Sequence, residues 1–189
     1  MTDREVLSFK TAKDWEAWLK TNHARSIGVW LRIPKKGSAK DPLTYAEALD
    51  VALCYGWIDG QKNGHDESSW LQKFTPRRPR SQWSKKNTEH AERLIRTRRM
   101  KPAGLAEIEA AKQDGRWKAA YDSARNATIP DDFLKVLKQN KKAETFFKTL
   151  NKTNLYSIAY RLQTAKTPAT REKRMNAILE MLTKGEKFH

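Results

Sequence analysis

The spacing of apolar residues changes once along this chain, and that change limits the fold more than any other feature of the sequence. Before about residue 76, short segments alternate apolar and polar side chains, whereas after residue 128 apolar side chains recur every three or four positions. A period of two is typical of strands, and a spacing of three to four is typical of helices. The sequence therefore predicts an α+β fold whose strands lie in the N-terminal part and whose C-terminal module is all helical.

The first predicted elements are a helix and a strand. Trp15, Trp18 and Leu19 share one face of a helix expected over residues 13–21. A half-buried strand is expected over 26–33, because apolar side chains alternate there with other residues. One side of that strand carries Ile27, Val29, Leu31 and Ile33, and the other carries Gly28, Trp30 and Arg32. Residues 34–42 are expected to form a loop.

A second helix and a hairpin follow in the prediction. Thr44 is the expected N-cap of the helix, because Glu47 three residues later completes a capping box. Gly56 is expected to end that helix. Strands are predicted over 57–61 and 69–75, joined by the polar, glycine-containing turn 62–68.

The rest of the chain is predicted to be helical. Ser84 is the expected cap of a helix that runs to about Arg99 and has a narrow apolar face. Pro168 and Gly185 mark the start and end of the last helix. The predicted division is an α+β domain over 1–100, a partly helical connector over 101–128, and a helical module over 129–189.

Positive charge is concentrated in one part of the chain. The sequence holds 38 Lys and Arg against 22 Asp and Glu, a net charge of +16. Residues 71–101 alone hold eleven basic residues and two acidic ones, Glu89 and Glu92. Such an excess attracts polyanions, including nucleic acid, and repels cationic peptides. The alternative is that the charge serves solubility alone.

A candidate anion site lies inside this basic segment, in PRRPRSQWSKKN at 76–87. Arginine forks and a helix N-terminus both bind phosphate groups, and aromatic rings stack on bases. The predicted anion-binding residues are Arg77, Arg78, Arg80, Ser81, Ser84, Lys85 and Asn87, with Trp70 and Trp83 as stacking residues. In the alternative interpretation the tryptophans belong to the core, Ser84 is only a cap, and the arginines pair with carboxylates.

A second basic group opens the last predicted helix. It consists of Lys166, Thr170, Arg171, Lys173 and Arg174, and Arg171 and Arg174 share a helical face. The group would extend the anion-binding surface if it faced the same side as the first one. The alternative is a solvated helix face.

Enzyme signatures are sparse. The best catalytic candidate is the acidic turn, where Asp59, His65, Asp66 and Glu67 could cluster and act as general acid or base. An ordinary solvated turn is the competing interpretation. The sequence has no P-loop and no nucleophile elbow, its histidines are scattered, and Cys54 has no partner. We therefore expect no metal or cofactor.

Several motifs resemble one known family. GWIDGQ at 56–61, FTPRRPRSQWSKKN at 74–87, and MKPAGL at 100–105 resemble the YdeI/OmpD-associated, or bacteriocin-protection, proteins. Residues 129–140 and 165–174 resemble the helical C-terminal module of that family. The resemblance implies an N-terminal domain similar to the YjbR/CyaY-like group, with helices packed on an antiparallel sheet. It also marks Trp57, Asp59 and Gly60 as motif-supporting residues, and it implies no reaction.

Two functional hypotheses follow. The first is a non-enzymatic, basic, cytoplasmic protein that binds a polyanion, with nucleic acid the leading ligand, and that contributes indirectly to antimicrobial-peptide or stress tolerance. The second is an enzyme or binding protein for a small anionic substrate, in which Asp59 and His65 take part. No signal peptide or membrane span is visible, the lone Cys54 fits a reducing compartment, and the oligomeric state stays open.

Overall fold

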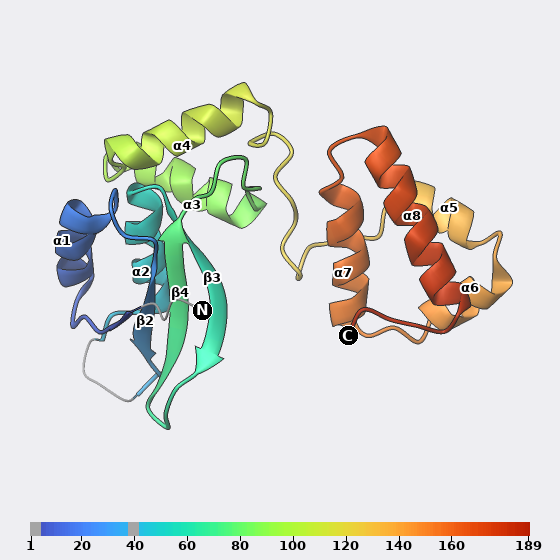
Figure 1. The fold of residues 1–189 in the computed structure, drawn as a ribbon, viewed down its shortest axis with the longest axis horizontal. Coiled ribbons are helices and arrows are strands. Elements are labelled where there is room, and N and C mark those ends of the chain that lie inside the picture. The colour runs from blue at the N-terminus through green and yellow to red at the C-terminus, as the bar shows by residue number, and fades with distance from the viewer. Residues whose placement is uncertain (1–4, 38–41) are drawn as a thin grey trace. The chain divides into compact units, whose positions relative to one another are not determined.

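A computed structural model describes residues 5–37 and 42–189, so part of the predicted loop over 34–42 lies outside the described residues. The chain divides into two compact units. The first unit consists of Met1–Ser81 and Asn87–Lys118, and the second of Gln82–Lys86 and Ala119–His189. The fold is α+β, as predicted, and the strands lie in the first unit (Figure 1).

The first unit is built on a sheet with the strand order β1-β2-β4-β3. Its elements are β1 (Val6–Leu7), α1 (Ala12–Asn22), β2 (Val29–Pro34), α2 (Tyr45–Cys54), β3 (Trp57–Gly64), β4 (Ser69–Pro76), α3 (Lys85–Arg96), whose first residues belong to the second unit, and α4 (Pro102–Gln113). The pairs β2·β4 and β3·β4 are antiparallel, and β1 pairs with β2 in parallel. The sheet is therefore antiparallel apart from a two-residue edge strand.

The capping box predicted at the start of α2 is confirmed, since Thr44 and Glu47 form it. Helix α1 begins at Ala12, one residue before the predicted start, with a capping box of Thr11 and Asp14 that was not predicted. Each box satisfies backbone N–H groups that the first helical turn leaves without partners. Gly56 follows α2 with a φ of 73°, a conformation that favours glycine.

The core of this unit lies between the sheet and the pair α1 and α2, which cover the same side of it (Figure 1). Trp15 is fully buried, its ring centroid lies 5.8 Å from that of Phe74, and its Nε1 donates to the carbonyl of Ala48 at 3.1 Å. Val29 pairs with Phe74, so alternate residues of β2 face this core. The other side of the sheet carries Trp30, which is half-buried.

Helix α4 belongs to the first unit, although residues 101–128 are predicted to form a connector. The reason is Gly104, which brings α4 close to the end of α2. A Cβ atom at Gly104 would lie 2.5 Å from the carbonyl oxygen of Cys54 and 2.6 Å from that of Leu53. The backbone N–H of Lys101 also donates to the Cys54 carbonyl at 3.2 Å. The PAGL sequence therefore allows two helices to approach closely.

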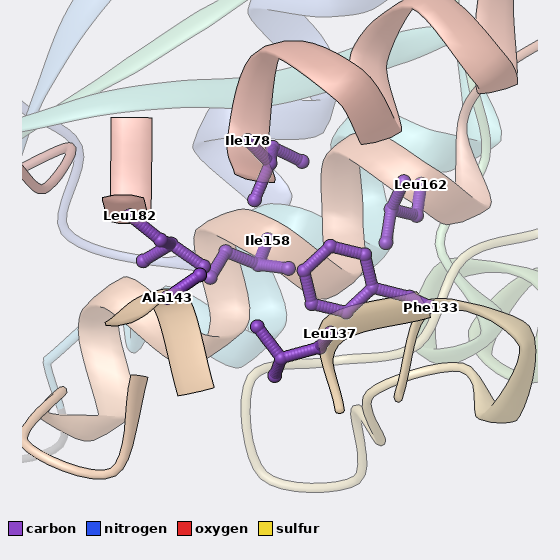
Figure 2. Packing of buried hydrophobic residues seen from close by; sticks show 7 residues of the cluster. All are labelled: Phe133, Leu137, Ala143, Ile158, Leu162, Ile178 and Leu182. Atoms are coloured by element: carbon purple, nitrogen blue, oxygen red, sulfur yellow. The ribbon is translucent and has the colours of Figure 1, made fainter. Parts of the chain in front are cut away.

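The second unit is helical, as predicted. Its helices are α5 (Asp131–Leu137), α6 (Lys141–Phe147), α7 (Lys152–Gln163) and α8 (Pro168–Thr183). Figure 2 shows their shared core of Phe133, Leu137, Ala143, Ile158, Leu162, Ile178 and Leu182. Asn140, Asn151 and Thr167 cap α6, α7 and α8 through their side-chain oxygens. Pro168 occupies the first turn of α8, as the sequence predicts.

Candidate anion-binding surface

The basic segment contains a tight turn just after β4. The backbone N–H of Ser81 donates to the carbonyl of Arg78 at 3.0 Å, and Arg80 has a φ of 61°. Pro79 at the second position and a positive φ at the third identify a type II turn, in which the third residue is normally glycine. Arg78 and Arg80 are exposed, so the turn directs two arginines to solvent.

A second arginine with a positive φ ends α3. Arg98 has a φ of 56°, its N–H donates to the carbonyl of Ile95 at 2.9 Å, and the N–H of Arg99 donates to that of Leu94 at 2.9 Å. These bonds form a Schellman motif, whose left-handed residue is usually glycine. The left-handed conformation costs an arginine about 1 kcal/mol. Helix α3 therefore ends at Arg96, three residues before the predicted end.

Four arginine side chains of this segment face solvent and have no partner among the residues that the structure describes. Arg78, Arg80, Arg96 and Arg98 are exposed. Within the described residues, their guanidinium groups make no hydrogen bond or ion pair. Two precede α3 and two lie at its end, and a helix of 12 residues is about 18 Å long. The exposed arginines therefore flank α3 in the sequence, two before it and two at its end.

Other predicted members of the anion site are part of the scaffold. Trp83 is 1% exposed, which corrects its assignment as a stacking residue, because a base could not reach its ring. Arg77 is 6% exposed and Asn87 is buried in α3. Lys85 forms an ion pair with Asp122 at 2.7 Å.

The two predicted serines are likewise held within the fold. Ser84 forms an isolated β-bridge with Tyr121. The Oγ atom of Ser81 is shielded from solvent, and no partner for it lies within the described residues. A hydroxyl contact from Ser81 to an anion would therefore require the turn to rearrange.

Trp70 remains half-buried, and its ring already has two neighbours. The Nζ atom of Lys62 lies 4.2 Å from the Trp70 ring centroid, and the Tyr45 ring lies 5.8 Å away. Trp30 on the outer side of the sheet has a more distant cation, Lys73, at 5.8 Å. The alternation of β2 already placed Trp30 on the polar side, and that signal could have identified it as an aromatic ring on the outer face of the sheet.

An ionic cluster that the sequence analysis missed takes up part of the charge. Asp50 in α2 accepts from His90 Nδ1 at 2.8 Å and from Arg93 Nη2 at 2.6 Å, and Arg99 lies 3.9 Å away. Burial opposes ionisation of Asp50, but the hydrogen bonds from Arg93 and His90 hold its pKa below the ordinary value. The cluster joins α2 to α3. An aspartate inside the apolar sequence EALDVALC was the available signal.

The acidic residues of the predicted catalytic turn do not come together. Asp59 accepts from the Tyr45 hydroxyl at 2.8 Å, and burial, followed by Asp59, raises the pKa of Tyr45. Gly64 lies five positions after Asp59 along β3, about 16 Å of strand. His65, Asp66 and Glu67 lie beyond that end and are exposed. An acid–base pair of Asp59 and His65 is therefore a wrong prediction.

Asp66 organises the β3–β4 turn. It accepts from the hydroxyls of Ser68 at 2.9 Å and Ser69 at 2.8 Å, and from Arg32 at 2.9 Å. The Ser69 hydroxyl, with Ser68 and Arg32, holds the pKa of Asp66 well below its usual range. The carboxylate stays ionised and acts as a turn former.

The second basic group caps a helix. Arg171 donates to Asp132 at 2.8 Å and to the carbonyl of Leu162 at 2.6 Å, and Arg174 donates to the carbonyl of Arg161 at 2.7 Å. These carbonyls lie at the end of α7, where a helix leaves acceptors without partners. Lys166 and Lys173 are exposed, while the backbone N–H of Thr170 donates to the N-cap Thr167. Arg171 and Arg174 therefore hold α8 against α7.

The motif-supporting residues also have structural roles. Trp57 is 1% exposed, and its Nε1 donates to the carbonyl of His23 at 3.1 Å. Gly60 lies where the pairing of β3 with β4 shifts register between Asp59 and Lys62. Within residues 5–37 and 42–189, no group of three or more His, Cys, Asp and Glu is placed to hold a metal ion. No helix in the same ranges is long and apolar enough to cross a membrane.

Two family descriptions match the chain. Residues 7–107 match "Domain of unknown function (DUF8412)", and residues 126–185 match "Bacteriocin-protection, YdeI or OmpD-Associated". The second match supports the resemblance read from the C-terminal motifs. The likeness of the N-terminal domain to the YjbR/CyaY-like group stays a prediction. Comparisons with curated proteins and with solved structures found no match.

Proposed function

The chain belongs to the family described by DUF8412, and from its surface we propose that it is a non-enzymatic protein that binds a polyanion, with nucleic acid the favoured ligand. The observation that carries the proposal is the set of four exposed arginines, Arg78, Arg80, Arg96 and Arg98, which have no partner among the described residues. Two of them occupy conformations that favour glycine. The left-handed conformation costs an arginine about 1 kcal/mol, and phosphate binding by the guanidinium group would account for that cost.

The spacing of these arginines favours a polymer over a small anion. One pair precedes α3 in the sequence and the other lies at its C-terminal end, and the helix between them is about 18 Å long. A single phosphate group cannot contact both pairs, whereas a nucleic acid carries phosphates along its whole length. Each contact to a phosphate releases counterions, which gives binding that weakens with added salt.

The outer side of the sheet supports a preference for single strands. Trp30 is half-buried there, and Lys73 on the neighbouring strand lies 5.8 Å from its ring. An aromatic ring beside a cation on an exposed sheet face is a platform for unpaired bases. Strand β4 carries Lys73 and continues into the arginine turn, so a base on Trp30 and phosphates on Arg78 and Arg80 can belong to one bound strand.

The family description suggests a biological setting. We propose that protection against bacteriocins arises indirectly, through a bound nucleic acid in the cytoplasm, because a protein with a net charge of +16 repels cationic peptides. We also keep the proposal that the first unit is related to the YjbR/CyaY-like group. Its support is the packing of α1 and α2 on one side of a mainly antiparallel sheet.

The test is a salt titration of binding to short duplex and single-stranded DNA. The double variant Arg78→Glu/Arg80→Glu should weaken binding and reduce the slope of log K against log salt by about 1.8 for duplex and 1.4 for single strands. The matched control is Lys152→Glu/Lys187→Glu, which changes two exposed lysines by the same charge. Equal losses in both variants would show that only bulk charge matters, and no binding at low salt would refute the proposal.

A second variant tests the sheet face. Trp30→Ala should weaken single-strand binding by about 5- to 100-fold, because stacking contributes about 1–3 kcal/mol per base. Binding to duplex, whose bases are already stacked, should change less. An equal loss for both forms of DNA would exclude Trp30 as a stacking platform.

A further inference from the structure

A groove in the first unit contains none of the four exposed arginines and is lined mainly by α1. Lys13, Ala17 and Lys20 line it from one face of that helix, and Lys101 contributes from the residue before α4. Positions 13 and 20 are seven residues apart, about 10 Å along the helix axis. Ala17 lies between them and has no long side chain to fill the space. Two ammonium groups therefore flank an open position on α1.

One wall of the groove is a histidine whose position is fixed by the fold. His23 Nδ1 lies 2.9 Å from the carbonyl oxygen of Leu19, and because a carbonyl only accepts, Nδ1 carries a hydrogen. The His23 ring packs against Tyr55 at 5.3 Å, and the His23 carbonyl accepts from Trp57 Nε1 at 3.1 Å. The remaining ring nitrogen, Nε2, has no partner among the described residues, and it donates a hydrogen bond to an anion only when both ring nitrogens carry hydrogen. Such a preorganised ring loses little conformational entropy on binding.

The charges of the groove are positive on balance. Glu16 is its carboxylate, and that carboxylate forms an ion pair with Lys101 at 3.0 Å. Lys13 and Lys20 remain exposed. Burial, followed by the negative charge of Glu16, raises the pKa of Tyr55 above its ordinary value of 10.0, so its hydroxyl keeps its hydrogen at neutral pH.

The surroundings of the groove suit a small ligand more than a polymer. Helix α1 carries two lysines and two acidic residues, Asp14 and Glu16, and is neutral as a whole. A polyanion lying along α1 would meet as many acidic as basic side chains, whereas a compact anion can contact the lysines alone. The neutral charge of α1 distinguishes the groove from the basic segment 71–101, where basic residues outnumber acidic ones.

We propose that this groove binds a small oxyanion, the phosphate or carboxylate group of a small molecule, between Lys13, Lys20 and the Nε2 side of His23. Ammonium groups supply charge-assisted hydrogen bonds to the oxygens, and Ala17 leaves the space that the anion fills. The site is independent of the proposed nucleic-acid surface, since it shares no residue with it. Either proposal can fail without the other.

The experiment uses the full chain and three probes: inorganic phosphate, pyrophosphate and succinate. Calorimetry should give one site per chain, and long-range proton–nitrogen NMR should show His23 Nε2 responding on the same titration curve. Binding of the phosphate probes alone identifies a phosphorylated ligand, and binding of succinate alone identifies a carboxylate. Saturable binding of none of them would overturn the proposal.

Two variants separate the groove from general charge. Lys13→Gln/Lys20→Gln should weaken binding of the probe that binds by about 10- to 100-fold, the loss expected for charge-assisted hydrogen bonds. Ala17→Leu fills the space without changing charge and should weaken binding to a similar degree. Lys152→Gln/Lys187→Gln is the charge-matched control and should bind as the wild type does. Unchanged binding in Ala17→Leu, or an equal loss in the control, would refute the site.

Discussion

Because α4 approaches α2 closely at Gly104, we predict that Gly104→Ala lowers the free energy of unfolding, the opposite of the usual effect of this substitution in a helix. Replacing glycine by alanine inside a helix normally stabilises it, by up to about 1 kcal/mol. At Gly104 the new Cβ atom would lie 2.5 Å from the Cys54 carbonyl oxygen and 2.6 Å from that of Leu53. These are backbone atoms, so no side-chain rotation relieves the overlap. The two helices would have to separate by about 0.9 Å to restore an ordinary contact of 3.4 Å.

The cost of that separation exceeds the gain in helix propensity. Overpacking of a buried contact costs about 1–3 kcal/mol, and a gap approaching 1 Å loses up to half of the dispersion energy between facing atoms. The expected net effect of Gly104→Ala is a loss of about 1–2 kcal/mol. For a chain of 189 residues, this corresponds to a fall in Tm of about 2–8 °C.

The assay is denaturant unfolding followed by tryptophan fluorescence, with thermal melting by circular dichroism. Gly64→Ala is the matched control, because apart from its chain neighbours no atom of the described residues lies within 4 Å of the position that its Cβ would take. That variant should be as stable as the wild type or slightly more stable. If Gly104→Ala were equally stable, the close helix contact would be refuted as the reason for glycine at this position.

Three further predictions concern charged residues. Arg80→Gly should raise the free energy of unfolding by up to about 1 kcal/mol, because glycine relieves the left-handed strain. It should also lower the affinity for DNA, because it removes a positive charge. Thermal melting checks the first effect, and a DNA-binding titration checks the second. The pKa of Asp50 is lower in the folded protein than its ordinary 3.8, so its contribution to stability is present above that pH and is lost as pH falls through the folded pKa. Unfolding measured between pH 5 and 2.5 should therefore show a flatter pH dependence for Asp50→Asn than for the wild type, and parallel curves would contradict the cluster. Arg171→Ala removes contacts to Asp132 and to the end of α7 and should cost about 1–3 kcal/mol, whereas the exposed Lys173→Ala should leave the unfolding midpoint within about 0.5 kcal/mol of the wild type.

Local patterns predicted most of the elements because their causes are local. The capping box of Thr44 and Glu47 acts within one helical turn, and the alternation of β2 follows from the burial of one side of the sheet. Strand β1 has two residues, too few to show a period, and it forms because β2 offers an unpaired edge. β3 extends to Gly64 through exposed residues because β4 pairs with it.

The candidate site was less predictable because ionic partners lie far apart in the sequence. Composition located the positive segment, but it could not show that Asp50, 43 residues before Arg93, binds that arginine. The indole of Trp83 and the guanidinium of Arg171 were equally ambiguous, since burial and capping depend on neighbours from other elements. Residue type therefore identified side chains that can bind an anion. Only the tertiary contacts showed which of those side chains face solvent and which already have partners inside the fold.

Arg80 and Arg98 occupy backbone conformations that glycine adopts more readily. Under the proposed function, selection for heat resistance and selection for nucleic-acid binding act in opposite directions at both positions. A population evolved at high temperature without its ligand should acquire glycine codons there, whereas a population that depends on the ligand should keep arginine. The residue fixed at these two positions in a lineage would then indicate which pressure has dominated its history.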